Sequence, residues 1–208
     1  MKLPRQRNAV RIILDEHEQL LAVTQGMLYF VRLIDKGETA PELKVFRAML
    51  YYIREYPEKI HHPKEGQYLF ARLRDRTNEL DETLEELESQ HMEGEALVRE
   101  LEHALTRYEL GGRFSFPAFR DLVEKYAAFY FSHMQLEEEV ILPAAKRLFT
   151  SEDWGIVDAA FAGNRDPFAG VDLSNDLEKL FLMIVNTIPV QNGLPHWDES
   201  SNAKLAAL

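Results

Sequence analysis

The sequence predicts an all-α protein, an up-down-up-down four-helix bundle with a C-terminal helical extension. Apolar residues recur at intervals of three and four over long stretches, which is the periodicity of helices that bury one face. Short segments with Gly and Pro separate these stretches, so consecutive helices are expected to lie antiparallel. The sequence shows no strand-like alternation, tandem repeat or low-complexity segment. We expect the bundle in residues 1–149 and accessory helices with a tail in residues 150–208.

The first two expected helices span about residues 8–36 and 42–76. The first ends where Gly37 interrupts the apolar pattern. The second contains Pro57 and Pro63. Each proline lacks the N–H that an α-helix needs, so we expect this helix to bend or restart there.

The other two helices of the bundle are expected at about residues 79–110 and 116–149. The third closes on two glycines, and the fourth has Ser115 as its expected N-cap with Pro117 in its first turn. After the bundle we expect a short capped helix from "TSEDWG", a turn at "NRDPFAGVD", an amphipathic helix in "SNDLEKLFLMIVNTI" and a tail.

The composition excludes several classes of function. Apolar residues make up 46% of the chain and charged residues 28%, as in ordinary globular proteins. Cysteine is absent from the sequence, which excludes disulfides, thiolate metal sites and thiol nucleophiles. A net charge of −11 disfavours a nucleic-acid partner. Neither a signal peptide nor a transmembrane segment is recognisable, so we expect no membrane association and a cytoplasmic location.

The histidines are arranged in a regular pattern. Three of the seven are followed four residues later by glutamate, each pair on a different expected helix: His61 and Glu65, His91 and Glu95, His133 and Glu137. Residues four apart project from one face of a helix. His17 belongs to the remaining helix, and all four histidines lie at matching distances from the turns, to within about two residues or roughly 3 Å of helix rise. They are therefore expected in one layer of the bundle.

A layer of buried imidazoles and carboxylates requires partners, because leaving such groups unpaired is costly. Nitrogen and oxygen ligands without thiolate suit iron, manganese or zinc. Glutamate can bridge two ions, and six or seven candidate ligands exceed what one ion ordinarily takes. The pattern therefore predicts a dinuclear site, with iron as the expected metal.

The motifs "DEHEQL", "HHPKEGQYLF", "ESQHMEGEAL" and "SHMQLEEEVILP" resemble those of the hemerythrin-like HHE cation-binding family, over roughly residues 8–149. This resemblance implies two non-haem iron ions, bridged by carboxylates with or without an oxo or hydroxo group. It implies the following ligands: His17, His61, His91 and His133 as terminal ligands, and Glu65 and Glu137 as bridges.

At one position the chain departs from the family pattern, because Glu95 stands where oxygen-carrying hemerythrins have a further histidine. We expect Glu95 to be a ligand, which would alter the iron's charge and argues against simple reversible oxygen transport. The spacing selects His61 over His62, which is interpreted as a neighbour of the site or a surface residue. Three further interpretations concern nearby groups: Glu138 and Glu139 face solvent, His103 and His196 lie outside the site, and Gly94 leaves space for a small ligand or serves packing.

The resemblance implies a protein that binds or senses a small diatomic ligand, O2 or NO, or that serves iron and redox homeostasis, rather than an enzyme. One alternative is a ferritin-like di-iron carboxylate oxidase or iron store, since Glu58 precedes His61 and Glu88 precedes His91 by three residues. Another is a metal-free helical interaction domain. The sequence identifies no protein partner, and a homodimer is compatible with it.

Overall fold

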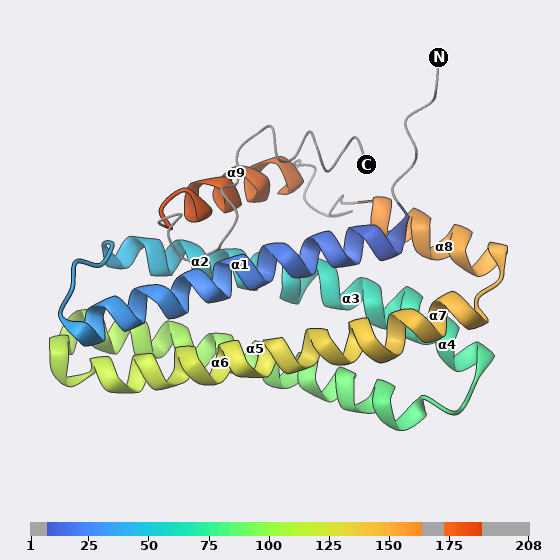
Figure 1. Cartoon of the computed structure of the whole chain (residues 1–208), viewed down its shortest axis with the longest axis horizontal. Coiled ribbons are helices and arrows are strands. Elements are labelled where there is room, and N and C mark those ends of the chain that lie inside the picture. The colour runs from blue at the N-terminus through green and yellow to red at the C-terminus, as the bar shows by residue number, and fades with distance from the viewer. Residues whose placement is uncertain (1–7, 164–172, 189–208) are drawn as a thin grey trace, which may run out of the picture.

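The computed structural model describes residues 8–163 and 173–188, and within these ranges four long helical rods form an up-down-up-down bundle (Figure 1). The first rod is α1 (Ala9–Lys36). The second is a continuous series of five segments: α2 (Leu43–Glu55), η1 (Pro57–His61), α3 (His62–Lys64), η2 (Glu65–Phe70) and α4 (Ala71–Arg76). The expected first and second helices are thereby confirmed.

The third and fourth rods complete the predicted all-α bundle. The third is α5 (Asp81–Gly111), and the one-turn 3₁₀ segment η3 (Gly112–Phe114) follows it. The fourth consists of α6 (Phe116–Leu136), η4 (Glu137–Ile141) and α7 (Leu142–Leu148). The described residues form no strand.

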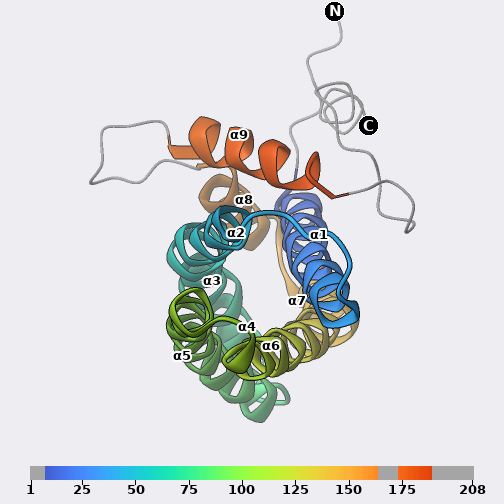
Figure 2. The same cartoon turned by 90° about the vertical axis from the view of Figure 1, so that its left-hand side faces the viewer.

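Two further helices lie on the outside of the bundle. α8 (Ser151–Ala162) packs against α1, and α9 (Leu173–Val185) lies across α1 and α2 (Figure 2). Both correspond to helices expected from the sequence. The expected turn at residues 164–172 and the expected tail, which contains His196, lie outside the described residues.

The ends of the helices follow their sequence signals in most places. Asn8 accepts a hydrogen bond from the Arg11 amide at 2.9 Å and caps α1. At the other end Gly37 adopts a left-handed conformation with φ of 74°, which suits a residue without Cβ. Ser115 occupies the predicted N-cap position of α6, but its side chain makes no capping hydrogen bond because η3 leads into the helix instead.

Two of the prolines coincide with short π-helical turns. η1 and η4 are both π-helical, and each is followed after one residue by a proline, Pro63 or Pro143. The amides of His62 and Leu142 reach back five residues, to the carbonyls of Pro57 and Glu137. A wider turn accommodates a proline ring that would clash with the carbonyl four residues earlier. The expected bend in the second rod is therefore a change of helical pitch.

The apolar core is divided into two clusters. One surrounds Phe46 and Phe119, toward the loop between α1 and α2, and the other surrounds Leu69 and Leu84 at the opposite end. Each rod runs from one cluster into the other. Between the clusters, each rod presents histidine or glutamate toward the bundle axis, so a buried polar layer interrupts the core.

α8 is attached through its first turn. Thr150 and Asp153 form a reciprocal capping box. Arg76 at the end of α4 donates two hydrogen bonds of 2.9 Å to the Asp153 carboxylate, which lowers the pKa of that group. Within the described residues, none of the helices combines the length and apolar character needed to cross a membrane.

Candidate metal centre

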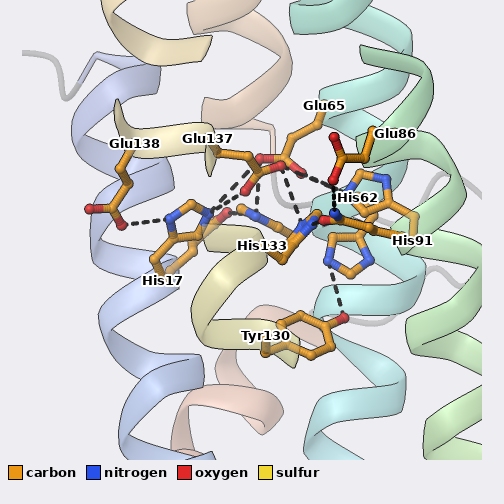
Figure 3. A network of polar contacts seen from close by, with 12 residues as sticks. His17, His62, Glu65, Glu86, His91, Tyr130, His133, Glu137 and Glu138 are labelled. Atoms are coloured by element: carbon orange, nitrogen blue, oxygen red, sulfur yellow. Dashed lines mark hydrogen bonds and ion pairs between the residues drawn. The ribbon is translucent and has the colours of Figure 1, made fainter. Parts of the chain in front are cut away.

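Side chains from all four rods converge in the polar layer (Figure 3). We call this group the histidine–glutamate cluster: His17 from α1, His61, His62 and Glu65 from the second rod, His91 from α5, and His133 and Glu137 from the fourth rod. The π-helical turns help to place them, because His61 ends η1, Glu65 begins η2 and Glu137 begins η4. Such turns are frequent at functional sites.

Glu65 lies between histidines on two sides. Its Oε1 atom is 3.2 Å from Nε2 of His61 and 4.0 Å from Nε2 of His17. Its Oε2 atom is 3.5 Å from Nε2 of His91. The carboxylate therefore presents one oxygen to each of two sets of imidazoles.

Glu137 repeats this arrangement from the fourth rod. Its Oε2 atom is 3.3 Å from Nε2 of His17. Its Oε1 atom is 3.4 Å from Nε2 of His133 and 3.8 Å from Nε2 of His91. The carboxylates of Glu65 and Glu137 thus both lie between His17 and His91, although they come from different rods.

The geometry divides the cluster into two sets of donor atoms, each of which could hold a metal ion. One contains His17, His61, Glu65 and Glu137, and the other His62, Glu65, His91 and His133. Within each set the donor atoms lie within 4.8 Å of one another, and Glu65 belongs to both.

The outer nitrogens of three histidines are fixed by hydrogen bonds. The Nδ1 atoms donate to Glu138 at 2.9 Å (His17), to Glu16 at 2.6 Å (His61) and to Gln90 at 2.9 Å (His133). When such a ring is neutral with its proton on Nδ1, its Nε2 presents a lone pair toward the cluster. This is the arrangement in which histidine binds metal, since the outer partner orients the ring.

His62 is buried and belongs to a smaller network of its own. Its ring stacks on His91 with centroids 4.0 Å apart and an angle of 12° between the planes. Tyr130 Oη lies 3.3 Å from Nε2 of His62 and donates a 2.7 Å hydrogen bond to Glu58. Burial raises the pKa of Glu58 to about 7.

Many polar atoms of the cluster have no hydrogen-bond partner among the described residues. They include both carboxylate oxygens of Glu65 and of Glu137, and the Nε2 atoms of His17, His91 and His133. Leaving one buried polar group unsatisfied costs about 1–3 kcal/mol. The unsatisfied atoms point at one another across the layer, which indicates a site for cations that all of them could share.

In the metal-free cluster, burial and the closeness of the ionisable groups shift their pKa values. Burial alone would lower the pKa of His17, but the adjacent carboxylates of Glu137 and Glu138 outweigh burial and raise it to about 9. Burial lowers the pKa of His133 to about 4. Burial and repulsion from Glu137 raise the pKa of Glu65.

Six of the seven predicted site residues meet in the cluster, and Glu95 does not. The side chain of Glu95 is 58% exposed and forms a 2.6 Å ion pair with Arg99. One turn after His91 the buried position on α5 is Gly94, and Glu95 lies on the exposed side of it. Of the other groups on α5, Glu88 is bound by Arg74 at 2.8 Å, so it is not available to the ferritin-like arrangement, and His103 is exposed as expected.

The interpretation of His62 as a surface residue is wrong, and that of Glu138 as facing solvent is incomplete. His62 is neither at the surface nor incidental, and it lies three residues before Glu65, a spacing that also shares a helix face. Glu138 does not simply face solvent, because its carboxylate holds His17. Glu16, which precedes His17, was also missed as the partner of His61. Glu16 and Glu138 directly neighbour His17 and Glu137 in sequence, and this adjacency was the available signal.

The surroundings of the cluster differ on its two sides. A cavity of about 310 Å³ opens beside His17 and is lined by residues of α1 and the fourth rod, including Met134 and Glu138. On the other side, a Cβ atom at Gly94 would lie 3.2 Å from Tyr130 Oη, so this glycine permits close packing of α5 on α6. The space beside Gly94 is therefore filled by the tyrosine.

Comparison with known protein families places the chain in a described family. Residues 8–145 match the family described as "Hemerythrin HHE cation binding domain". No curated protein and no solved structure gives a significant match to the chain. The matched stretch contains the whole histidine–glutamate cluster. The chain therefore belongs to the hemerythrin HHE cation-binding family.

Proposed function

We propose that the protein binds two iron ions in the histidine–glutamate cluster and uses them to bind or sense a small diatomic ligand, O2 or NO. His17 and His61 would hold one ion, and His62, His91 and His133 the other. Glu65 and Glu137 would serve both ions. Glu95 is left out of this proposal, and His62 is added to it, because of where the structure places them.

The observation that carries the proposal is the position of the two buried carboxylates. Each directs one oxygen toward His17 and the other toward His91. A single ion would leave one oxygen of each carboxylate unsatisfied, whereas two ions would satisfy all four. Nitrogen and oxygen donors without thiolate fit iron, and they also fit manganese or zinc.

The cavity beside His17 and the aromatic rings on the opposite side of the cluster indicate where a small ligand would reach the metal ions. Iron held there would supply a redox-active ion with a coordination position for a diatomic ligand. One set contains two histidines and the other three. With both carboxylates shared, the ion held by His17 and His61 would have fewer protein donors, and the cavity beside His17 adjoins it. Aromatic rings enclose the other set, where Phe70 stacks on His91 and Phe129 on His133. We infer that the ligand binds on the His17 side.

The alternatives have less support. A ferritin-like site draws on Glu-x-x-His motifs from two helices, and Glu88 of the second motif is bound by Arg74 instead. A metal-free interaction domain would leave the buried oxygens of Glu65 and Glu137 without hydrogen-bond partners among the described residues.

The test is anaerobic reconstitution of the purified chain with ferrous iron, followed by optical spectroscopy as O2 or NO is added. We expect a ligand-dependent ferric or iron–nitrosyl absorption. His91→Ala should abolish or strongly reduce it, and His103→Ala, an exposed histidine on the same helix, should leave it unchanged. A spectrum without iron bands, or equal spectra for the two variants, would contradict the proposal.

A further inference from the structure

α9 buries one face against α1 and α2 while leaving the other in solvent. Phe181, Ile184 and Val185 are buried in the core cluster around Phe46, whereas Met183 is 57% exposed. The contact is therefore a packed interface of the kind that holds a helix in place.

The interface depends on a glycine in the middle of α1. A Cβ atom at Gly26 would overlap the side chain of Ile188, which follows α9, and would lie 3.2 Å from Met49 Cε. Glycine inside a helix is less favourable than alanine. Its presence here lets Ile188 lie directly on the α1 backbone.

A continuous series of contacts links α9 to the cluster. The ring of Phe181 contacts that of Tyr52, with centroids 5.7 Å apart, and Tyr52 stacks on Tyr56 at the same separation. The Tyr56 hydroxyl donates to one oxygen of Glu16. The other oxygen of Glu16 accepts the 2.6 Å hydrogen bond from Nδ1 of His61.

These contacts leave the intermediate groups little freedom. Tyr52 is 1% exposed and Glu16 is 6% exposed, and Tyr52 also donates to Gln19 at 3.0 Å. Both oxygens of Glu16 are in use, so a rotation of the Glu16 carboxylate would disturb its hydrogen bonds to both Tyr56 and His61. Tyr56 in turn packs on the ring that Phe181 covers.

We propose that α9 is a positioning element for the metal centre: its docking holds His61 through Tyr52, Tyr56 and Glu16, and a metal ion at His61 holds α9 in place. The inference rests on the proposed metal binding. A bound ion would fix the His61 ring with its Nδ1–H directed at Glu16, whereas metal-free His61 lies in a cluster of unsatisfied atoms. The effect of metal on α9 docking must equal the effect of docking on metal affinity, because coupling between two sites is reciprocal.

The first test is hydrogen–deuterium exchange of the full chain, metal-free and loaded with Zn²⁺ or anaerobically with Fe²⁺. We expect metal to slow exchange in the α9 peptides by about fivefold or more, the lower end of usual coupling strengths. Tyr56→Phe breaks the link to Glu16. In this variant metal should still bind, but exchange in α9 should no longer depend on it.

The second test measures the reciprocal effect. Phe181→Ala should weaken metal binding by the same factor of about five or more, and Met183→Ala, on the exposed face of α9, should not. Helix content by circular dichroism verifies that each variant folds. If metal binds and α9 exchange stays the same, the coupling is overturned while the metal centre stands. If no metal binds, both proposals fail.

Discussion

At the scale of the residue, the cluster places two carboxylates beside each other in a buried layer. Glu65 is 0% and Glu137 1% exposed, and five histidines surround them. Paired burial of like charges is tolerated only where cations or protons compensate it. In the metal-free protein the imidazoles supply those protons, and metal ions would replace them.

The role of the carboxylates can be tested with two matched substitutions. Glu65→Gln removes a donor that both sets share, so we expect it to lower iron content and weaken binding by tenfold or more, within the range for disturbed metal sites. Glu95→Gln changes an exposed residue four positions after His91, and iron content should not change. Iron analysis of the two reconstituted variants decides between a ligand role for Glu65 and one for Glu95.

Metal affinity should depend on pH with a definite sign. The pKa of His17 is raised to about 9 in the metal-free protein, so this imidazole is protonated at neutral pH. Ligation requires the neutral form, so binding releases a proton and affinity rises toward pH 9, by about tenfold per pH unit for each proton displaced. Zn²⁺ titrations at several pH values measure the slope, and a pH-independent affinity would contradict the role of His17.

The raised pKa of His17 gives the stability of the metal-free fold the opposite pH dependence, so stability falls as pH rises toward 9. The pKa of His17 in the folded chain lies above its value of 6.5 in the unfolded chain. The stabilisation is complete below pH 6.5 and is lost as pH rises through about 9. Urea denaturation of metal-free protein should therefore show lower stability at pH 9 than at pH 7. His133, with a pKa lowered to about 4, stays neutral over this range.

The residue scale is also where prediction from sequence was least complete. Helical spacing placed His17, His61, His91 and His133 correctly in one layer. It did not distinguish Glu95, which turns outward, from His62, which turns inward, because the π-helical turns around His62 change the direction of successive side chains. The hydrogen bond from His61 to Glu16 joins two rods, and helical spacing describes only residues within one rod.

At the scale of the element, the rods were largely predictable because each carries a long apolar stripe, and α1 and α5 end at glycine. Gly37 ends α1 where expected, and Pro63 alters the second rod where expected. The form of that alteration, a π turn, depends on how the neighbouring rods pack. The packing of Ile188, which follows α9, on Gly26 of α1 is likewise a contact between residues far apart in sequence.

Two glycines offer a comparison at this scale. Gly155 in α8 has no neighbouring atom within 4 Å of a Cβ position, so Gly155→Ala should raise the free energy of unfolding by up to about 1 kcal/mol. Gly26→Ala has the same gain in helix propensity but collides with Ile188. We expect no net stabilisation and faster hydrogen exchange in α9. A stabilisation equal to that of Gly155→Ala would show that Ile188 does not press on α1.

At the scale of the whole molecule, the fold has two apolar clusters joined through a polar layer. This division makes the bundle dependent on what occupies the layer, because all four rods contribute to it. A ligand that binds only the folded state stabilises it by about 2.7 kcal/mol at a hundred times its dissociation constant. For a chain of this size that corresponds to a rise in Tm of roughly 5–11 °C.

Thermal unfolding of the metal-free and Zn²⁺-loaded protein measures this stabilisation. We expect chelator to reverse the rise in Tm. His103→Ala should preserve the rise, since this histidine is exposed and outside the layer. A Tm that is indifferent to metal would mean that the layer is satisfied by protons alone.

The most direct test of the central claim is native mass spectrometry of the chain reconstituted anaerobically with ferrous iron, because it counts the ions bound to each molecule. The account predicts two ions in the unaltered chain. His61→Ala and His91→Ala, each removing a donor from a different set, should shift the population toward one ion. A chain that binds no iron, or never more than one ion, would contradict a centre in which Glu65 and Glu137 serve two metals.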